Sequence, residues 1–242
     1  MPRNHLKRIN APPSWPIKRK TTKWITRPTP GPHPLAQAMP LTFVLREMLG
    51  VAKTLHEVKS ILHGKKVLVN KTVRTDRKFP IGLMDVLEIP DLEQAYRVVL
   101  TPRGKFTLIP VEKAEAKVKP CRIAGKTILA GKKVQLNLSD GRTLLVDKDA
   151  YKVNDTLLID LEKWNTEKTK AKAITKHLKL EEGARIYLTD GTHVGTVGTV
   201  DSITPAFPTP FVTVTAKDAR FETPKRFAFV IDPSLTLGEV AP

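Results

Sequence analysis

Apolar residues recur with a helical period over one short stretch of the chain and with a two-residue period over most of the rest. Residues 41–49 place their apolar side chains on one helix face, and Gly50 follows where a helix can end. Thr54 and Glu57 have the spacing of a capping box, which predicts a second helix that Gly64 ends. Neither helix can bury its apolar stripe alone, so we expect the two to pack against each other.

The rest of the pattern predicts strands, which makes the expected fold class α+β and mostly β. Thr101 to Lys105 and Ser139-Asp140-Gly141 are typical of hairpin turns. Residues 163–182 are rich in Lys and Thr and predict a short helix or a linker. The expected strands cover residues 66–70, the stretch from 73, 85–89, 97–100, 106–111, 133–138, 142–146, 156–161, 185–189, 194–200, 211–215 and 226–231.

The first forty residues show neither period. They contain nine prolines, two tryptophans and no Asp or Glu. Proline disfavours helices and central strands, and like charges repel, so we expect an extended arm that becomes ordered only on a polyanion such as RNA. A tether to a membrane surface is an alternative, but the segment lacks an amphipathic helix. Its eight cations are Arg3, Lys7, Arg8, Lys18, Arg19, Lys20, Lys23 and Arg27.

The charge of the chain is large and unevenly spread. The 242 residues carry a formal net charge of +17. Residues 1–40 and residues 96–182 each contribute +8, residues 41–95 contribute +2, and residues 183–242 contribute −1. The front and middle of the chain are therefore expected to meet the polyanion more than its end.

Cysteine usage and hydropathy indicate the compartment. Cys121 is the only cysteine, which excludes an internal disulfide and a multi-cysteine zinc site and fits a reducing, cytoplasmic location. No stretch approaches the roughly 20 apolar residues of a membrane span, so we expect no membrane partner.

A basic edge is expected on the small α-α-β unit that ends near Pro90. Side chains spaced along such an edge could follow a phosphate backbone, although a solvated charged surface is the ordinary alternative. Lys59 and His63 are four residues apart and share one helix face. The members of the edge are Lys59, His63, Lys65, Lys66, Lys71, Arg74, Arg77 and Lys78.

Glycines recur near the end of the chain at Gly183, Gly191, Gly195 and Gly198. Asp190-Gly191 is typical of a tight turn, and the two later glycines indicate sharp bending or close backbone approach. This pattern favours a small, strongly curved barrel, with a plain hairpin as the alternative.

Catalytic residues are not visible in the sequence. Gly125-Lys126-Thr127 ends like a phosphate-binding loop, but Pro120 stands where that motif needs glycine, and no helix follows. The six histidines have no metal-ligand spacing, and His193 fits a turn. Cys121 has no visible base partner and is expected to be a small packed side chain. We therefore expect no catalytic residue, metal, cofactor or small-molecule substrate.

Motifs along the chain resemble a known family. The stretch 183–200 resembles a KOW motif, and residues 41–89 resemble the small RNA-binding domain named after bacterial ribosomal protein S-four. Together they resemble the S-four-e family of small-subunit ribosomal proteins, in its archaeal rather than its eukaryotic form. The quoted motifs are Gly64 to Asn70, Val73 to Asp76, Pro80 to Ile89, His5 to Arg8, Ala11-Pro12, Gly31-Pro32-His33, Lys152 to Thr156 and Ile159 to Glu162.

The resemblance implies a multi-domain, non-enzymatic protein of the ribosome. It would be a structural constituent of the small subunit in translation, bound to small-subunit (16S-type) rRNA and to other small-subunit proteins in the cytoplasm. The implied divisions are an extended basic rRNA-binding arm (1–40), an S-four-like RNA-binding domain (41–92), a central β domain (93–170), a KOW-type barrel (171–216) and a C-terminal strand and tail (217–242).

RNA contacts are expected in the arm, the basic edge and the central domain, and the single residues expected to make them lie in the first two divisions. Trp15 and Trp24 could stack on bases or wedge against the folded body. The acidic Asp190 at the KOW turn and the charge of −1 predict that residues 183–242 face protein or solvent. The expected contacts are Arg3, His5, Lys7, Arg8, Trp15, Lys18, Arg19, Lys20, Lys23, Trp24, Arg27, His33, Arg46, Lys53, Lys59, His63, Lys65, Lys66, Asn70, Lys71, Arg74, Arg77 and Lys78.

Two other functions stay open at this point. Similar RNA-binding domains accompany pseudouridine synthases, so an RNA-modifying enzyme is one alternative. It would need a catalytic domain with a pocket, which the small β units do not indicate. A KOW transcription-elongation factor is the other alternative.

Overall fold

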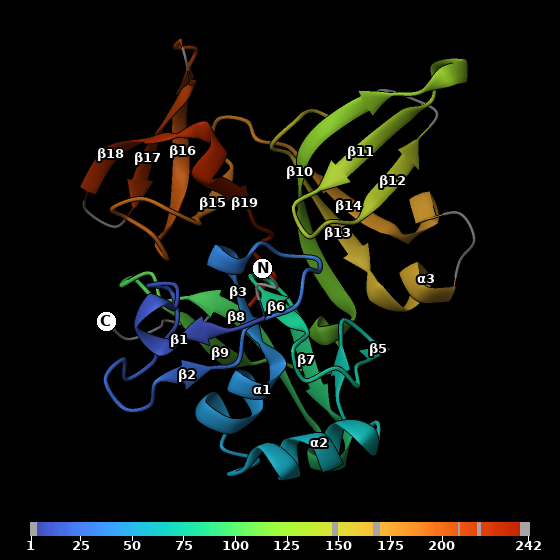
Figure 1. Cartoon of the computed structure of the whole chain (residues 1–242). Helices are drawn as coiled ribbons and strands as arrows, with labels where there is room; N and C mark the ends of the chain where they lie inside the picture. Colours follow the sequence, from blue (N-terminus) through green and yellow to red (C-terminus); the bar gives the residue numbers. More distant parts are fainter. Residues whose placement is uncertain (1–3, 147–149, 167–169, 208, 217–218, 238–242) are drawn as a thin grey trace. The chain divides into compact units, whose positions relative to one another are not determined.

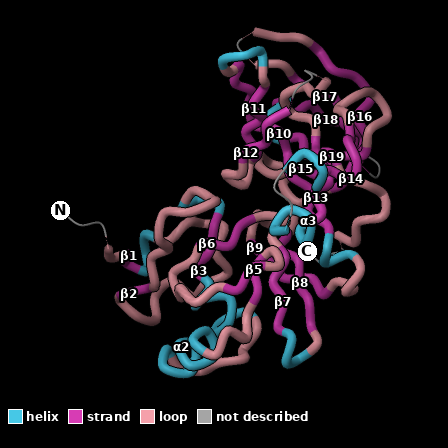
Figure 2. The backbone as a smooth tube through the Cα atoms, turned by 90° about the vertical axis from the view of Figure 1, so that its right-hand side faces the viewer, coloured by secondary structure: helices cyan, strands magenta, loops and turns pink. Residues whose placement is uncertain are grey.

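The computed structural model describes residues 4–146, 150–166, 170–207, 209–216 and 219–237 (Figure 1). Most of the regular backbone in Figure 2 is strand, drawn in magenta, and the helical segments in cyan are short. This confirms the α+β, mostly β class. The chain divides into two compact units. Unit 1 comprises residues 1–99 and 105–117, and unit 2 comprises residues 100–104 and 118–242.

Unit 1 is built on a five-stranded sheet in the order β5-β4-β7-β8-β9. Strands β7 and β8 pair antiparallel from Val86 opposite Arg97 to Ile89 opposite Gln94. The expected boundary between residues 92 and 93 therefore falls within a continuous sheet. The strands are β4 (Leu68–Val69), β5 (Thr72–Val73), β7 (Val86–Ile89), β8 (Gln94–Leu100) and β9 (Phe106–Pro110).

Two helical segments accompany this sheet, as the pattern predicts. The first starts as α1 (Leu41–Phe43) and continues as a π-helical turn over Val44–Met48. The second is α2 (Leu55–His63), where the Oγ1 atom of Thr54 accepts a hydrogen bond from the Glu57 backbone N–H at 3.2 Å. The Glu57 carboxylate in turn accepts from the Lys53 N–H at 2.8 Å. These bonds confirm the predicted helix start.

Residues 4–40 belong to unit 1 and pack into its fold through short strand pairs, whereas the sequence predicts an extended arm. Strand β1 (Leu6–Lys7) pairs with β2 (Trp24–Ile25), and β3 (Ala38–Pro40) pairs with β6 (Pro80–Gly82). Prolines exclude long regular elements, but they do not prevent side chains from being buried. Short strand pairs and tertiary hydrogen bonds replace regular structure here.

Trp15 shows how this segment is held. Its side chain is 1% exposed and stacks on Phe43, with ring centroids 5.8 Å apart. Its Nε1–H donates to the Ala38 carbonyl at 2.7 Å. Nearby, the Phe106 N–H donates to the Ser14 carbonyl at 2.9 Å, which joins the segment to β9. Of the two expected roles for Trp15, the wedge is therefore the observed one.

The first sheet of unit 2 has the order β12-β11-β10-β13-β14, with helix α3 (Leu161–Thr166) after β13. Its two unexpected strands are β10 and β14. Pro120 and a register shift next to Gly125 interrupt the period of β10, and β14 lies in the Lys- and Thr-rich stretch. Gly125-Lys126-Thr127 lie inside β10 and are followed by a three-residue 3-10 turn, Ala130–Lys132, instead of the α-helix that the motif needs. The strands are β10 (Val118–Ile128), β11 (Val134–Leu138), β12 (Thr143–Val146), β13 (Thr156–Asp160) and β14 (Ile174–Leu178).

The second sheet of unit 2 has the order β18-β17-β16-β15-β19 and buries an apolar cluster that includes Ile186, Val200 and Val212. Strand β16 starts later than expected and shifts register between Val200 and Ser202, and β18 was not expected. The strands are β15 (Arg185–Leu188), β16 (Val197–Thr204), β17 (Phe211–Ala216), β18 (Ala219–Pro224) and β19 (Ala228–Val230).

Close backbone approach explains two of the late glycines. Gly195 has φ +78°, and a Cβ atom there would lie 2.5 Å from the Thr101 carbonyl oxygen. A Cβ atom at Gly198 would lie 2.6 Å from a methyl carbon of Val214. The left-handed φ angles of Gly183 and Gly191 account for the other two positions.

Candidate nucleic-acid interface

An exposed basic and aromatic surface lies on residues 5–24 of unit 1. Lys7, Lys18, Lys20 and Lys23 are exposed, and no ion pair within the described part of the chain includes them. Trp24 is 51% exposed, with Lys23 Nζ 5.4 Å from its ring centroid and the His5 ring 5.5 Å away. We call His5, Lys7, Lys18, Lys20, Lys23 and Trp24 the arm surface.

Two arginines of the same segment bond to groups within the protein and are not part of the arm surface. Arg8 is 6% exposed; its guanidinium contacts a Glu47 carboxylate oxygen at 2.9 Å and donates to the Lys18 carbonyl at 2.7 Å. Arg19 donates to the carbonyls of Ile9, Ala11 and Pro12 at 2.9–3.1 Å. The expectation that Arg8 contacts RNA is wrong, as it is for Trp15, because both side chains are buried.

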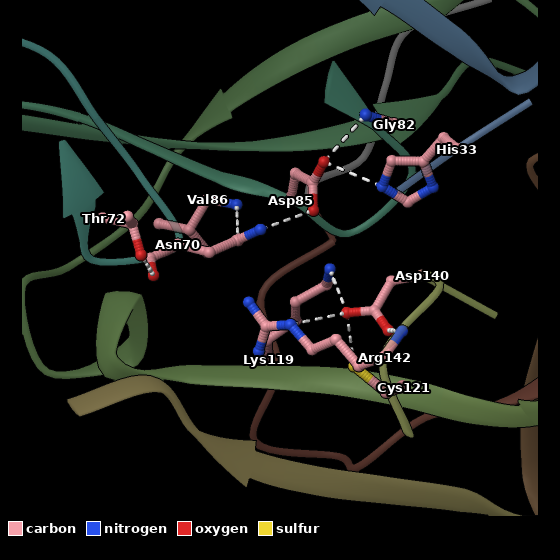
Figure 3. A network of polar contacts seen from close by, with 10 residues as sticks. All are labelled: His33, Asn70, Thr72, Gly82, Asp85, Val86, Lys119, Cys121, Asp140 and Arg142. Carbon is pink, nitrogen blue, oxygen red and sulfur yellow. Dashed lines mark hydrogen bonds and ion pairs between the residues drawn. The ribbon is translucent and has the colours of Figure 1, made fainter. Parts of the chain in front are cut away.

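His33 and Asn70 also point into the protein, around the fully buried Asp85 (Figure 3). One oxygen of Asp85 accepts from the Gly82 N–H at 2.8 Å and lies 2.9 Å from His33 Nε2. Its other oxygen accepts from the Asn70 side-chain amide at 2.8 Å, and Asn70 Oδ1 accepts from the Val86 N–H at 3.0 Å. These bonds satisfy the buried carboxylate of Asp85 and fix both side chains. Of these two expected RNA contacts, Asn70 is buried, whereas His33 lines a groove of unit 1.

The predicted basic edge is only partly free. Lys66 is paired with Asp91 and Lys71 with Glu88, both at 2.7 Å, while Arg46 contacts Glu47 at 2.8 Å. The Arg74 guanidinium lies 4.3 Å from the centroid of the Phe79 ring. These pairs lower the net charge that the edge can present to RNA.

The open part of the edge lies on and just after α2. Lys59 and His63 are exposed one helical turn apart, and Lys65 follows at the helix end with φ +56°. Lys53 is exposed just before the helix. Arg27, Arg77 and Lys78 are half-buried, and Arg3 lies outside the described residues.

A second buried network, in unit 2, makes the thiol of the one cysteine unreactive (Figure 3). An Asp140 carboxylate oxygen lies 2.8 Å from Lys119 Nζ, 3.3 Å from Arg142 Nε and 3.4 Å from Cys121 Sγ. Burial, and next the charge of Asp140, raise the pKa of the Cys121 thiol far above its usual range. Cys121 therefore stays protonated and packed, as the sequence predicts.

The turn before β16 is fixed within the second sheet of unit 2. The Asp190 side chain accepts from the Gly191 N–H at 2.8 Å, and the His193 ring stacks on Phe221 with centroids 3.8 Å apart. The acidic residue that departs from the expected turn thus serves the turn itself. No group of His, Cys, Asp and Glu within the described ranges could hold a metal, and no helix there is long and apolar enough to span a membrane.

Comparison with known proteins identifies the family. The model of "Ribosomal family S4e" matches residues 92–165, and the model of "RS4NT (NUC023) domain" matches residues 1–36. The small ribosomal subunit protein eS4 of Methanocella arvoryzae is 41% identical over 230 residues, 94% of each chain. The chain belongs to the ribosomal family S4e. The resemblance seen in the sequence is thereby confirmed.

Further S4e relatives match over almost their whole length. The eS4 protein of Archaeoglobus fulgidus is 38% identical and covers 94% of this chain and 92% of its own, and that of Aeropyrum pernix is 38% identical and covers 98% and 96%. The crystal structure of the 30S ribosomal protein S4e from Thermoplasma acidophilum matches with a TM-score of 0.69 and 29% identity. It covers 82% of this chain and 96% of that chain.

The sequence identified the exposed cations of the chain. It did not show which of the expected RNA contacts are instead buried and stabilise the fold. Arg8, His33 and Asn70 are buried or turned inward, and each lies within a motif that carried the family resemblance. For Asn70 the sequence did contain a signal: a polar residue directly after a buried strand, here β4, often has its side chain buried too. Sequence reasoning also missed that Arg27 and Lys78, 51 positions apart by number, line one groove.

Proposed function

We propose that this chain is a structural constituent of the small ribosomal subunit and binds its rRNA through the arm surface and the open residues around α2. The observation that carries the proposal is the arm surface: four exposed lysines in the same short segment as an exposed Trp24, in a chain of the S4e family. Lysines neutralise phosphates, and an exposed indole offers a stacking face for an unpaired base. Other small-subunit proteins are the further partners, at the ribosome in the cytoplasm.

Folding of the arm before binding makes this contact efficient. The cations of residues 7–23 sit on a segment whose Trp15 is already buried, so fewer residues lose conformational freedom when RNA arrives. Family membership supports rRNA binding, and the exposed cations of the arm surface and of α2 support contacts in unit 1. The sequence adds the central domain as a further RNA contact and predicts that residues 183–242 face protein or solvent.

The other functions considered have less support. An RNA-modifying enzyme needs an acid, base or nucleophile at a site. Cys121 is protonated, and Asp85 and Asp140 are used in buried structural networks. A KOW transcription factor would need the glycine-rich segment 183–200 as its main surface. The His193 ring of that segment is stacked on Phe221, while the arm surface and the exposed cations around α2 lie in unit 1.

The arm surface can be tested by its salt dependence. Lys18→Gln/Lys20→Gln/Lys23→Gln should bind small-subunit rRNA more weakly, because three cations can no longer release counterions. The log–log salt slope should fall by about 2 to 3 in total, at roughly 0.7–0.9 for each phosphate that is no longer neutralised. Filter binding of the full chain at several salt concentrations measures this slope.

The matched control removes charge from the second sheet of unit 2 through Arg220→Gln/Lys225→Gln, and its slope should stay near that of the unaltered chain. An unchanged slope in the triple variant would contradict the arm surface. A lower slope in the control alone would move the RNA contact to unit 2.

A further inference from the structure

An open groove of about 730 Å³ lies within unit 1, between the segment of residues 27–35 and Lys78. Its walls come mainly from four prolines of residues 28–34 and from Leu35, and Asn4, Arg27 and Lys78 supply polar groups. The size falls within the range of about 300–1,000 Å³ that is usual for small-ligand sites. An apolar wall with a few converging polar groups is also their usual composition.

The side chains of the two groove cations pair with no carboxylate of the described residues, although the Asp76 carboxylate accepts from the Lys78 backbone N–H at 2.9 Å. Arg27 and Lys78 are half-buried, and neither forms an ion pair within the described residues. No Asp or Glu lines the groove. Since Lys66, Lys71, Arg8 and Arg46 of the same unit are all paired, the groove is a place where positive charge is left for a ligand.

The groove is held open by the fold around it. The Thr29 N–H donates to the Lys78 carbonyl at 3.0 Å, and a Cβ atom at Gly31 would lie 2.6 Å from Pro80. The His33 ring covers Gly82 and is bound to the buried Asp85 (Figure 3). These contacts fix the walls before a ligand arrives, so binding costs little reorganisation.

We propose that this groove holds one unpaired nucleotide of the rRNA, an inference that rests on the proposed function. The phosphate lies between Arg27 and Lys78, the base packs on the proline and Leu35 wall, and the Asn4 amide meets the base edge. An amide can donate and accept at once, which suits the edge of a base. Specific recognition of RNA favours such splayed, unpaired nucleotides over the duplex.

An acidic peptide is the competing ligand, and the backbone argues against it. A peptide that adds to an edge needs main-chain donors on that edge. The prolines at every second position from 28 to 34 have no N–H, and the N–H of Thr29 already donates to Lys78. The groove could therefore attract an acidic peptide by its charge, but it has almost no main-chain N–H groups with which to pair it.

The test uses the full chain, small-subunit rRNA and chemical probing of unpaired bases. Arg27→Gln/Lys78→Gln should expose to modification a base that the unaltered chain protects, and should lower the salt slope by about 0.7, the contribution of one single-stranded phosphate. All other protected bases should stay protected. Asn4→Ala should weaken the same protection and leave the slope unchanged.

Two controls accompany these variants. Arg220→Gln/Lys225→Gln removes the same charge elsewhere and should keep the protected base. Lys78→Gln alone changes neither the Lys78 carbonyl that accepts from the Thr29 N–H nor Arg27, so it serves if the double variant unfolds; it should expose the same base in part.

Distinct outcomes separate the inference from the function on which it rests. If the groove variants keep every protection while the chain binds rRNA, the nucleotide site is wrong and the function stands. If the variants lose a crosslink to an acidic ribosomal protein while all bases stay protected, a peptide occupies the groove and the proposal is overturned. If the unaltered chain protects no base of small-subunit rRNA, both the nucleotide site and the proposed rRNA binding are wrong.

Discussion

Single residues of unit 1 are either buried in the fold or exposed at its surface, and the residue type alone does not tell which. Asp85 and Asp91 are both carboxylates near β7, yet Asp85 is fully buried while the side chain of Asp91 is about half exposed. Asp85 organises three partners through its two oxygens. A buried carboxylate with satisfied bonds stabilises a fold mainly because its partners would be left unpaired without it.

Asp85→Ala should lower the free energy of unfolding by about 3 kcal/mol, because the Asn70 amide and the Gly82 N–H would be buried without an acceptor. Urea unfolding of the full chain measures the change. Asp91→Asn breaks only an exposed pair with Lys66, so its effect should stay within about 0.5 kcal/mol. Equal losses in the two variants would show that the Asp85 network contributes nothing special.

Elements were predictable where one local signal decided them. The capping residues Thr54 and Glu57 fix α2, and the hairpin at residues 139–141 joins two expected strands. Strand β10 was not predicted because Pro120 and Gly125 both normally interrupt a strand. The pairing of β10 with β13 and β11 nevertheless accommodates both residues. Tertiary pairing, which no local window contains, decided the structure there.

The candidate site shows the same limit. The exposed lysines of the arm surface could be foreseen from charge, since a lysine without a neighbouring acid is usually solvated. The inward turn of His33 depends on Asp85, which lies 52 positions further along the chain. The groove depends on Arg27 and Lys78 being brought together by β-pairing around residues 38–40 and 80–82. Such long-range meetings carry no local pattern.

Glycine at the start of β16 gives a test at the scale of an element. Gly195→Ala should destabilise unit 2 by more than about 2 kcal/mol, since the new Cβ would meet the backbone of Thr101 at 2.5 Å in addition to the cost of a left-handed φ. Gly131→Ala has nearly the same φ, +77°, but meets nothing within 4 Å. It should cost about 1 kcal/mol. Thermal unfolding compares the two, and equal costs would argue against close packing at Gly195.

At the scale of the whole molecule, the basic segment of residues 4–40 is part of unit 1 rather than an appendage to it. Its four lysines face outward, while Arg8, Trp15, Leu6 and Ala11 are buried. The segment therefore contributes to stability and to charge at once, which means that removing it would confuse loss of RNA binding with loss of fold. Substitution of exposed lysines is the cleaner way to test its function.

Trp15→Ala should lower the stability of the RNA-free protein by about 3–5 kcal/mol, the usual cost of removing a buried aromatic side chain. Trp24→Ala removes a half-exposed ring and should change stability by less than about 1 kcal/mol. Denaturant unfolding without RNA gives both values. A negligible effect of Trp15→Ala would mean that the segment is not docked before RNA binds.

The bond between Ser14 and Phe106 also sets an order of events during synthesis. The basic segment leaves the ribosome first, but its partner on β9 follows about 90 residues later, roughly 5–20 s at the usual speed of elongation. During that interval the nascent segment is a loose polycation in a compartment full of RNA. Its docking onto β9 then holds the exposed lysines in fixed positions, so RNA meets a defined surface only after this later part of the chain has been made.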